Sequence, residues 1–318
     1  MGNGNNISHN HHYVPQFHQK YFANNNGIIY AYNKLKNKSF TPRTKDIFAD
    51  ENRNTFINAD GNKSDTIEKI YSGLESKCNE ALRKFTETKI FNKDCKNILL
   101  FFAYLSKWRS PEYDPSYEDA KQLTFEDLRL HLGNVELGID YNLDELWQDE
   151  ERQEFKRILL SIQPFIYKED YKDIVKNTFI LETPEPFNAI LGSCPFLENS
   201  FTPNIFESFL FPLTPKYTLI YLNHCNIKDW TKFYIENISI MLPLINNLRD
   251  LSIYHASRDI LISNTPERLK FISDKYNLIA KSKLDPRTLQ SLLFQTMIES
   301  YKDKNILEKI RDIFNSNN

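Results

Sequence analysis

The sequence predicts an α+β protein that folds as one globular unit, with a small mixed or antiparallel sheet and a large helical portion. Long segments with apolar residues at three- and four-residue spacing alternate with short segments of period two, in the order strand, helix, strand, helix. Hydrophobic residues make up 41% of the 318 residues, which is enough to bury a sizeable core. Because there is no internal repeat and no disordered linker, we expect residues 1–318 to form a single domain.

The N-terminal part is expected to start with an extended segment and a hairpin. Pro15 favours an extended backbone before it, which places His12 on an extended lead-in. Residues 27–32 are rich in β-branched and aromatic residues and end in polar turn residues, and a second extended stretch is expected near 38–41. Residues 54–56 are expected to be extended within a loop.

Two long helices should follow. Residues 65–86 have apolar residues at helical spacing, and Glu68 and Glu75 share one stripe beside the apolar face. Residues 94–109 are apolar nearly all round, which predicts a central buried helix that Pro111 ends. Further helices are expected over 117–132, 143–162, 237–254, 265–276, 286–301 and 304–315, and strands over 178–181, 189–191, 218–222 and 260–263. Residues 266–318 are therefore a helical C-terminal extension of the same unit.

Composition excludes several classes of function. The formal net charge of −2 gives no overall basic field for nucleic acid, although a local basic patch remains compatible with it. The 8 glycines are not clustered, so there is no phosphate-binding loop of an ATPase, a kinase or a nicotinamide enzyme. The 4 cysteines have no CxxC spacing and no apolar run is long enough for a bilayer. We expect a cytoplasmic protein with no membrane partner and with no cofactor, nucleotide cofactors included.

The opening segment His11-His12-Tyr13-Val14-Pro15-Gln16-Phe17-His18 is the most distinctive part of the chain. It resembles the signature of a bacterial family, domain of unknown function 4238, the HYVPQ-motif family. The helix with Glu68 and Glu75, and Arg109 after a buried helix, are similar to features of that family, and the resemblance covers most of residues 9–265.

The later matching segments contain one departure from the family pattern. Gly192-Ser193-Cys194-Pro195 stands where the family has Ser-Asp-Asn-Pro, so Cys194 replaces an acid. Phe211-Pro212-Leu213-Thr214-Pro215 resembles the next motif, and Asn247 and Arg258 fall in the last matching segment. The resemblance implies an accessory-gene protein of the kind found near phage-defence loci, and it implies no chemistry.

The candidate catalytic residues are His12, Glu68, Glu75 and Arg109. His12 is either a general acid-base or a structural histidine bonded to a backbone carbonyl, whereas His9, His11 and His18 are expected to be exposed. The two glutamates either activate water or form an ion pair with Arg109 at the rim of the core. No ligand set for a metal is visible.

Six residues are candidates for substrate binding. Tyr13 or Trp108 is expected to stack on a ring of the ligand. Asn247 is expected to contact a polar edge of the ligand together with Tyr254, and both lie near Arg249. The others come from the family-like motifs: Gln16, Ser193 and Arg258. Ser193 lacks the glycine that a nucleophile elbow needs after serine, so it is not expected to be a nucleophile.

Three functions are compatible with these residues. The first is a cofactor-free hydrolase that acts on DNA, including phage-modified DNA, in antiviral defence, in the form of an N-glycosylase that excises a base. The second is a non-catalytic module that senses a nucleotide or nucleic acid. The third is a metal-dependent nuclease.

Overall fold

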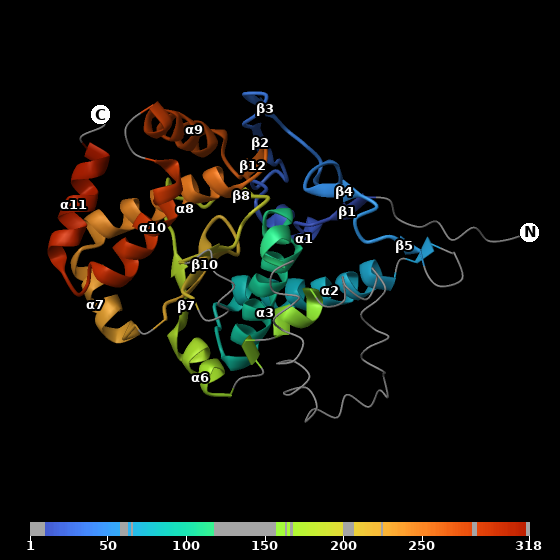
Figure 1. Ribbon diagram of the computed structural model, residues 1–318, viewed down its shortest axis with the longest axis horizontal. Helices are drawn as coiled ribbons and strands as arrows, with labels where there is room; N and C mark the ends of the chain where they lie inside the picture. Colours follow the sequence, from blue (N-terminus) through green and yellow to red (C-terminus); the bar gives the residue numbers. More distant parts are fainter. Residues whose placement is uncertain are drawn as a thin grey trace, which may run out of the picture.

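The computed structural model describes residues 10–57, 63–64, 66–117, 157–162, 164–165, 168–199, 207–223, 225–281 and 285–315. In these ranges every strand pairing is antiparallel, and the strands form two four-stranded and two two-stranded sheets, with helices packed around them (Figure 1). The α+β class is therefore confirmed, with two main sheets in place of the expected one.

The first four-stranded sheet joins segments that are far apart in the chain. Its strands lie in the order β3, β2, β12 and β8, with bounds Lys38–Phe40, Tyr30–Asn33, Ile260–Ser263 and Leu191–Gly192. The predicted hairpin is β2 and β3, and β12 pairs with β2 so that Ile262 lies opposite Ala31. This pairing brings the segment before β12 close to the N-terminal segment.

The second sheet forms much of the core. Its order is β7, β11, β10 and β9, with bounds Thr178–Glu182, Tyr217–Tyr221, Phe209–Pro212 and Leu197–Glu198. Both β10 and β11 are wholly buried, which agrees with their apolar sequences. The aromatic side chains of β10 pack on the buried helix α3, Lys93–Arg109, as in the contact of Phe211 with Phe102.

The short strands position the N-terminal motif. Strand β1, Asn10–His12, pairs with β4, Ala49–Glu51, which confirms the extended conformation expected before Pro15. Helix α1, Gln16–Tyr21, starts directly after that proline, and the 3-10 turn η1, Thr44–Asp46, precedes β4. Strands β5 and β6, Phe56–Ile57 and Lys63–Ser64, form a separate small ladder.

Helices α2 and α3 match the sequence prediction closely. Helix α2, Thr66–Thr88, buries one face and leaves the other in solvent. Helix α3 is capped by the side chain of Asn92, which accepts a hydrogen bond from the backbone nitrogen of Cys95. It ends at Arg109, and the 3-10 turn η2, Pro111–Tyr113, begins two residues later because proline cannot continue the helical hydrogen bonds.

The remaining helices gather mainly at the other end of the molecule (Figure 1). Their bounds are α6 Lys168–Asn177, α7 Ile227–Glu236, α8 Ile238–Ala256, α9 Pro266–Lys281, η4 Pro286–Thr288, α10 Leu289–Phe294, the π-helical turn η5 Gln295–Glu299 and α11 Lys304–Asn315. Side chains from α7 to α11 share one hydrophobic core with β7, β10 and β12. The helices expected over 117–132 and 143–162 lie largely outside the described residues, although 157–162 is helical. No helix in the described ranges could cross a membrane.

Candidate active site

His12 is held at the end of β1 with one ring nitrogen engaged. Its Nε2 lies 3.1 Å from the carbonyl oxygen of Thr44 in η1, and the side chain is half-buried. A carbonyl oxygen only accepts hydrogen bonds, so Nε2 carries the proton and Nδ1 keeps its lone pair. Among the described residues, Nδ1 has no hydrogen-bond partner. This arrangement leaves a proton acceptor on the imidazole.

Burial keeps this imidazole neutral. It is the largest effect on the pKa of His12, which lies below its usual value of 6.5. The positive charge of Arg109 lowers the pKa further, whereas the Thr44 carbonyl and the carboxylates of Glu68 and Glu75 raise it. All three charged side chains therefore lie within electrostatic reach of His12. The balance of these effects gives a neutral histidine at pH 7, which can accept a proton.

Arg109 connects β1 to α2 from the end of α3. Its Nη1 lies 2.5 Å from Oε1 of Glu75, its Nη2 donates to the backbone carbonyl of His12, and its guanidinium lies 4.0 Å from the centre of the Tyr71 ring. Only 3% of the residue is exposed. Burial lowers the pKa of Arg109, but the charge of Glu75 and the Tyr71 hydroxyl outweigh burial and raise it. Arg109 is thus a permanent cation that fixes the position of the His12 backbone.

Glu68 and Glu75 both extend from α2 beside this arginine. Asn54 Nδ2 donates to Oε2 of Glu68 at 2.9 Å, and the Glu75 side chain keeps 22% of its surface exposed. The two residues are seven positions apart, or about 10 Å along the helix axis. We call His12, Glu68, Glu75 and Arg109 the inner cluster. At pH 7 two carboxylates and one guanidinium give it a formal charge of −1.

Two other predicted residues, Ser193 and Arg258, meet at a carboxylate that the sequence did not single out, Glu112 in η2. The hydroxyl of Ser193 donates to Oε1 of Glu112, and the backbone nitrogen of Arg258 donates to Ser193 Oγ at 2.8 Å and to Glu112 Oε1 at 3.1 Å. Burial raises the pKa of the Tyr13 hydroxyl, and Asp50 and Glu112 add to this effect. We call Tyr13, Glu112, Ser193 and Arg258 the outer cluster.

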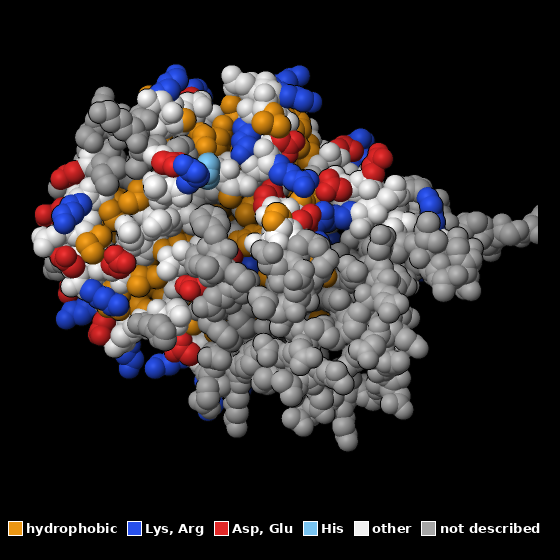
Figure 2. Space-filling model, in the orientation of Figure 1, with side chains coloured by type: hydrophobic (Ala, Val, Ile, Leu, Met, Phe, Trp, Pro, Cys, Tyr) orange, Lys and Arg blue, Asp and Glu red, His pale blue; other side chains and the backbone are white. Residues whose placement is uncertain are grey.

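A chain of ion pairs lies between the two clusters. Asp114, just after η2, contacts Arg53 and Arg157, each at 2.7 Å. Burial alone would raise the pKa of Asp114, but the two guanidinium groups outweigh it and lower the pKa. Arg53 also lies 3.7 Å from Asp50 and donates to the backbone carbonyl of Arg109 at 3.5 Å. Acidic and basic side chains accordingly lie close together on this part of the surface (Figure 2).

The sequence offered one signal for these missed residues. Glu112 and Asp114 follow the proline that ends the buried helix, so they had to lie near Arg109. Arg53 and Asp50, by contrast, join the site through the pairing of β4 with β1, which no local pattern predicts.

Cys194 does not replace the acid of the family pattern chemically. The thiol is buried, and burial is the main cause that raises its pKa well above the usual value, so it remains protonated. Glu112 instead supplies the carboxylate beside Ser193.

Two residues that were expected to bind substrate, Gln16 and Trp108, instead contact other parts of the protein. Gln16 Oε1 accepts a hydrogen bond from the hydroxyl of Thr44 at 3.0 Å, so it supports the turn that holds His12. Trp108 is buried beside Tyr117 and Leu160, with 1% of its surface exposed, and its ring has no open face for a base.

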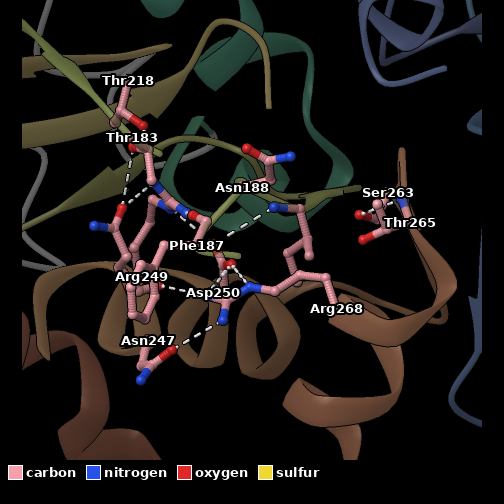
Figure 3. A network of polar contacts seen from close by, with 12 residues as sticks. Thr183, Phe187, Asn188, Thr218, Asn247, Arg249, Asp250, Ser263, Thr265 and Arg268 are labelled. Carbon is pink, nitrogen blue, oxygen red and sulfur yellow. Dashed lines mark hydrogen bonds and ion pairs between the residues drawn. The ribbon is translucent and has the colours of Figure 1, made fainter. Parts of the chain in front are cut away.

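Asn247 and its neighbour Arg249 belong to a buried network on α8, in which Asn247 Oδ1 accepts a hydrogen bond from Arg268 (Figure 3). Asp250 forms ion pairs through both carboxylate oxygens. Its Oδ1 lies 2.7 Å from Arg249 Nε, and its Oδ2 lies 2.7 Å from Arg268 Nη2. The two guanidinium groups also donate to other oxygens around them: Thr218 Oγ1, Asn246 Oδ1, Asn247 Oδ1, and the carbonyls of Phe187 and Asn246. A network satisfied in this way holds α8, α9 and the second sheet together.

The histidines next to the motif are buried, so the prediction that they are exposed was wrong. His11 accepts a hydrogen bond from the backbone nitrogen of Asn54 on Nδ1 at 2.6 Å. His18 lies on the inner face of α1, where Nε2 contacts the carbonyl of Pro212 at 2.9 Å. His9 lies outside the described residues. Within the described ranges no three His, Cys, Asp or Glu side chains are grouped for a metal.

The comparisons with known proteins identify one relationship. A family model described as "Protein of unknown function (DUF4238)" matches residues 10–179, more than half of the chain. This range includes the whole inner cluster and Glu112, whereas Ser193, Asn247 and Arg258 lie beyond it. No curated protein and no solved structure matches the chain.

Proposed function

The chain belongs to the DUF4238 family, and we propose that it is a cofactor-free hydrolase that releases a base from DNA in bacterial defence against phage. In this proposal the segment from His12 to Phe17, with its HYVPQ sequence, supplies the catalytic histidine. The observation that supports the proposal is the inner cluster: a neutral histidine whose Nδ1 has no hydrogen-bond partner in the described part of the chain, in a cluster with a formal charge of −1.

The sign of that charge favours cleavage of a glycosidic bond over cleavage of a phosphodiester. A glycosidic bond breaks through an oxocarbenium-like state in which positive charge develops on the sugar. Two carboxylates beside one guanidinium stabilise such a cation, whereas they would repel the negative charge that accumulates on a phosphoryl group under attack. Glu68 and Glu75 are therefore assigned to electrostatic stabilisation of the sugar.

The proposed step is a single hydrolytic displacement. His12 Nδ1 takes a proton from a water molecule as the water oxygen bonds to C1′ of the deoxyribose. The bond between C1′ and the base nitrogen breaks, and its electron pair leaves with the base. The proton on His12 then passes to the departing base, so the products are a free base and an abasic sugar with a C1′ hydroxyl. Arg109 is a positioning residue, because it binds the His12 carbonyl and the Glu75 carboxylate.

The direct test incubates the purified protein with plain and phage-modified DNA and measures free base and abasic sites. We expect His12→Asn to fold normally and to lose at least about tenfold in rate, since asparagine cannot take up a proton near neutral pH. His255→Asn is the matched control. His255 is also half-buried and has one ring nitrogen 2.7 Å from the Tyr276 hydroxyl, but it lies on α8. Equal activity in both variants would refute the catalytic role of His12.

The pH profile and a chelator give independent readouts. Because the pKa of His12 lies below 6.5, the rate should rise with pH only on the acid side and be level from about pH 7 upward. Activity should also survive EDTA. If EDTA abolishes activity and Mg²⁺ or Zn²⁺ restores it, with strand cuts as products, the protein is a metal-dependent nuclease.

A further inference from the structure

A strip of basic side chains lies on the β2–β3 hairpin and on η1. Residues 34–45 contain five basic residues and no acidic one: Lys34, Lys36, Lys38, Arg43 and Lys45. Lys36, Lys38 and Lys45 are exposed, and Arg43 is exposed with Asp46 as its ion-pair partner at 2.7 Å. Basic side chains appear beside this hairpin at the upper edge of Figure 2. We call the four exposed residues of this set, Lys36, Lys38, Arg43 and Lys45, the basic strip.

The tip of the hairpin is held in a defined shape. Asn37 has a φ of 48°, and its Oδ1 accepts a hydrogen bond from the Tyr32 hydroxyl at 2.7 Å. Lys34 fixes the base of the tip, because its backbone nitrogen donates to the Asp259 carbonyl and its Nζ to the Tyr254 carbonyl at 2.9 Å. The tip presents Leu35 to solvent, with 76% of its surface exposed. An aliphatic side chain at a rigid, basic tip has no role in the core.

The basic strip leads directly to the inner cluster. Thr44, whose carbonyl holds Nε2 of His12, stands between Arg43 and Lys45 in the sequence and in η1. A polyanion bound along the strip is thereby brought to the side chain that the proposed reaction uses. The strip is positively charged and the inner cluster has a formal charge of −1. The phosphates of the strand should therefore bind to the strip, and the sugar on which positive charge develops should lie at the inner cluster.

We propose that the basic strip binds the phosphodiester backbone of DNA, with Leu35 inserted against the bases, and that it delivers the strand to His12. This inference rests on the proposed function, since it places the substrate of the same site. Apolar wedges inserted between base steps are a common way in which proteins unstack and kink a duplex. An anionic membrane is a weaker fit, because the one exposed leucine at the tip buries too little apolar surface for insertion.

The test measures binding separately from catalysis. Fluorescence anisotropy of a labelled DNA duplex is recorded over a range of salt concentrations with wild-type protein and with Lys36→Gln/Lys38→Gln. Two lost phosphate contacts should lower the slope of log affinity against log salt by about 1.8, and should weaken binding by up to about 60-fold at 0.1 M salt. The matched control is Lys228→Gln/Lys232→Gln, which removes two exposed lysines from α7 at the other end of the molecule.

Leu35→Ser tests the wedge. It should weaken binding to the duplex about tenfold and leave the salt slope unchanged, because no phosphate contact is lost. Circular dichroism spectra and melting temperatures should match wild type for all variants, since every altered side chain is exposed.

The possible results of these experiments distinguish failure of the DNA-binding inference from failure of the proposed glycosylase function. Wild-type affinity in Lys36→Gln/Lys38→Gln, or an equal loss in the α7 control, overturns the inference. It is also overturned if wild-type protein binds vesicles of anionic lipid and not DNA. If the strip variants lose DNA binding but wild-type protein releases no base, the interface stands and the glycosylase proposal fails.

Discussion

The buried His18 makes the protein sensitive to mild acid. Its ring lies among aromatic side chains, with ring centres 5.0 Å from Phe102 and 5.3 Å from Phe211. Burial lowers the pKa of His18 from 6.5 to about 4, although the backbone of Pro212 and Leu213 partly offsets this effect. The unfolded chain therefore binds a proton at a higher pH than the folded chain does.

The size of the effect follows from the two pKa values. Stability from neutral His18 is complete above about pH 6.5 and is lost as the pH falls towards 4, because protonation then favours the unfolded chain. At 1.36 kcal/mol per pKa unit, the whole difference is worth about 3 kcal/mol in the free energy of unfolding. Between pH 7 and pH 5 the loss is about 2 kcal/mol.

Urea denaturation at pH 7, 6 and 5 measures this loss. The informative variant is His18→Gln, which retains an N–H donor for the Pro212 carbonyl but has no proton to gain. It should lose about 2 kcal/mol less than wild type between pH 7 and pH 5. His255→Gln is the control, and because that histidine is only half-buried its effect should be smaller. Parallel pH profiles for wild type and His18→Gln would refute the reasoning.

Three substitutions probe other buried groups. Glu75→Gln should lower the free energy of unfolding by about 2–3 kcal/mol in urea denaturation, because buried Arg109 loses its charged partner; an unchanged value would make the pair dispensable. Gly192→Ala places a Cβ 2.0 Å from Ser257 Oγ and should cost about 2 kcal/mol, which Ser257→Gly in the same chain should largely restore. Asp250→Asn leaves two buried guanidinium groups without a counter-charge and should cost about 3–5 kcal/mol, so a melting temperature equal to that of wild type would contradict the reading of the network.

Local signals in the sequence predicted the elements on which the site is built. Pro15 indicated the extended segment of His12, and Pro111 marked the end of the helix that carries Arg109. Helical spacing placed Glu68 and Glu75 on one helix. These signals depend on residues close together in the chain, and that is why they could be read without a structure.

Contacts between distant segments could not be predicted in this way. His11 and His18 resemble surface histidines in the sequence, yet both are buried, His11 against Asn54 in the turn after β4 and His18 against Pro212 of β10. Arg249 resembles a free cation in the sequence, yet Thr218 and the carbonyl of Phe187 accept its hydrogen bonds in the folded chain. Whether a polar side chain contacts a ligand or the core depends on such packing, which periodicity does not encode.

The pairing of β2 with β12 has a consequence for how the protein is made. Ala31 and Ile262 are partners across that ladder, roughly 230 residues apart, so the N-terminal strand waits about 10–50 s at ribosomal speed before its partner is synthesised. During that interval the edge of β2 is open to other chains, and the segment that holds His12 lacks the neighbouring residues around Arg258. The newly made chain thus acquires its outer cluster only after Arg258 has been synthesised, and a shorter nascent polypeptide carries an incomplete site.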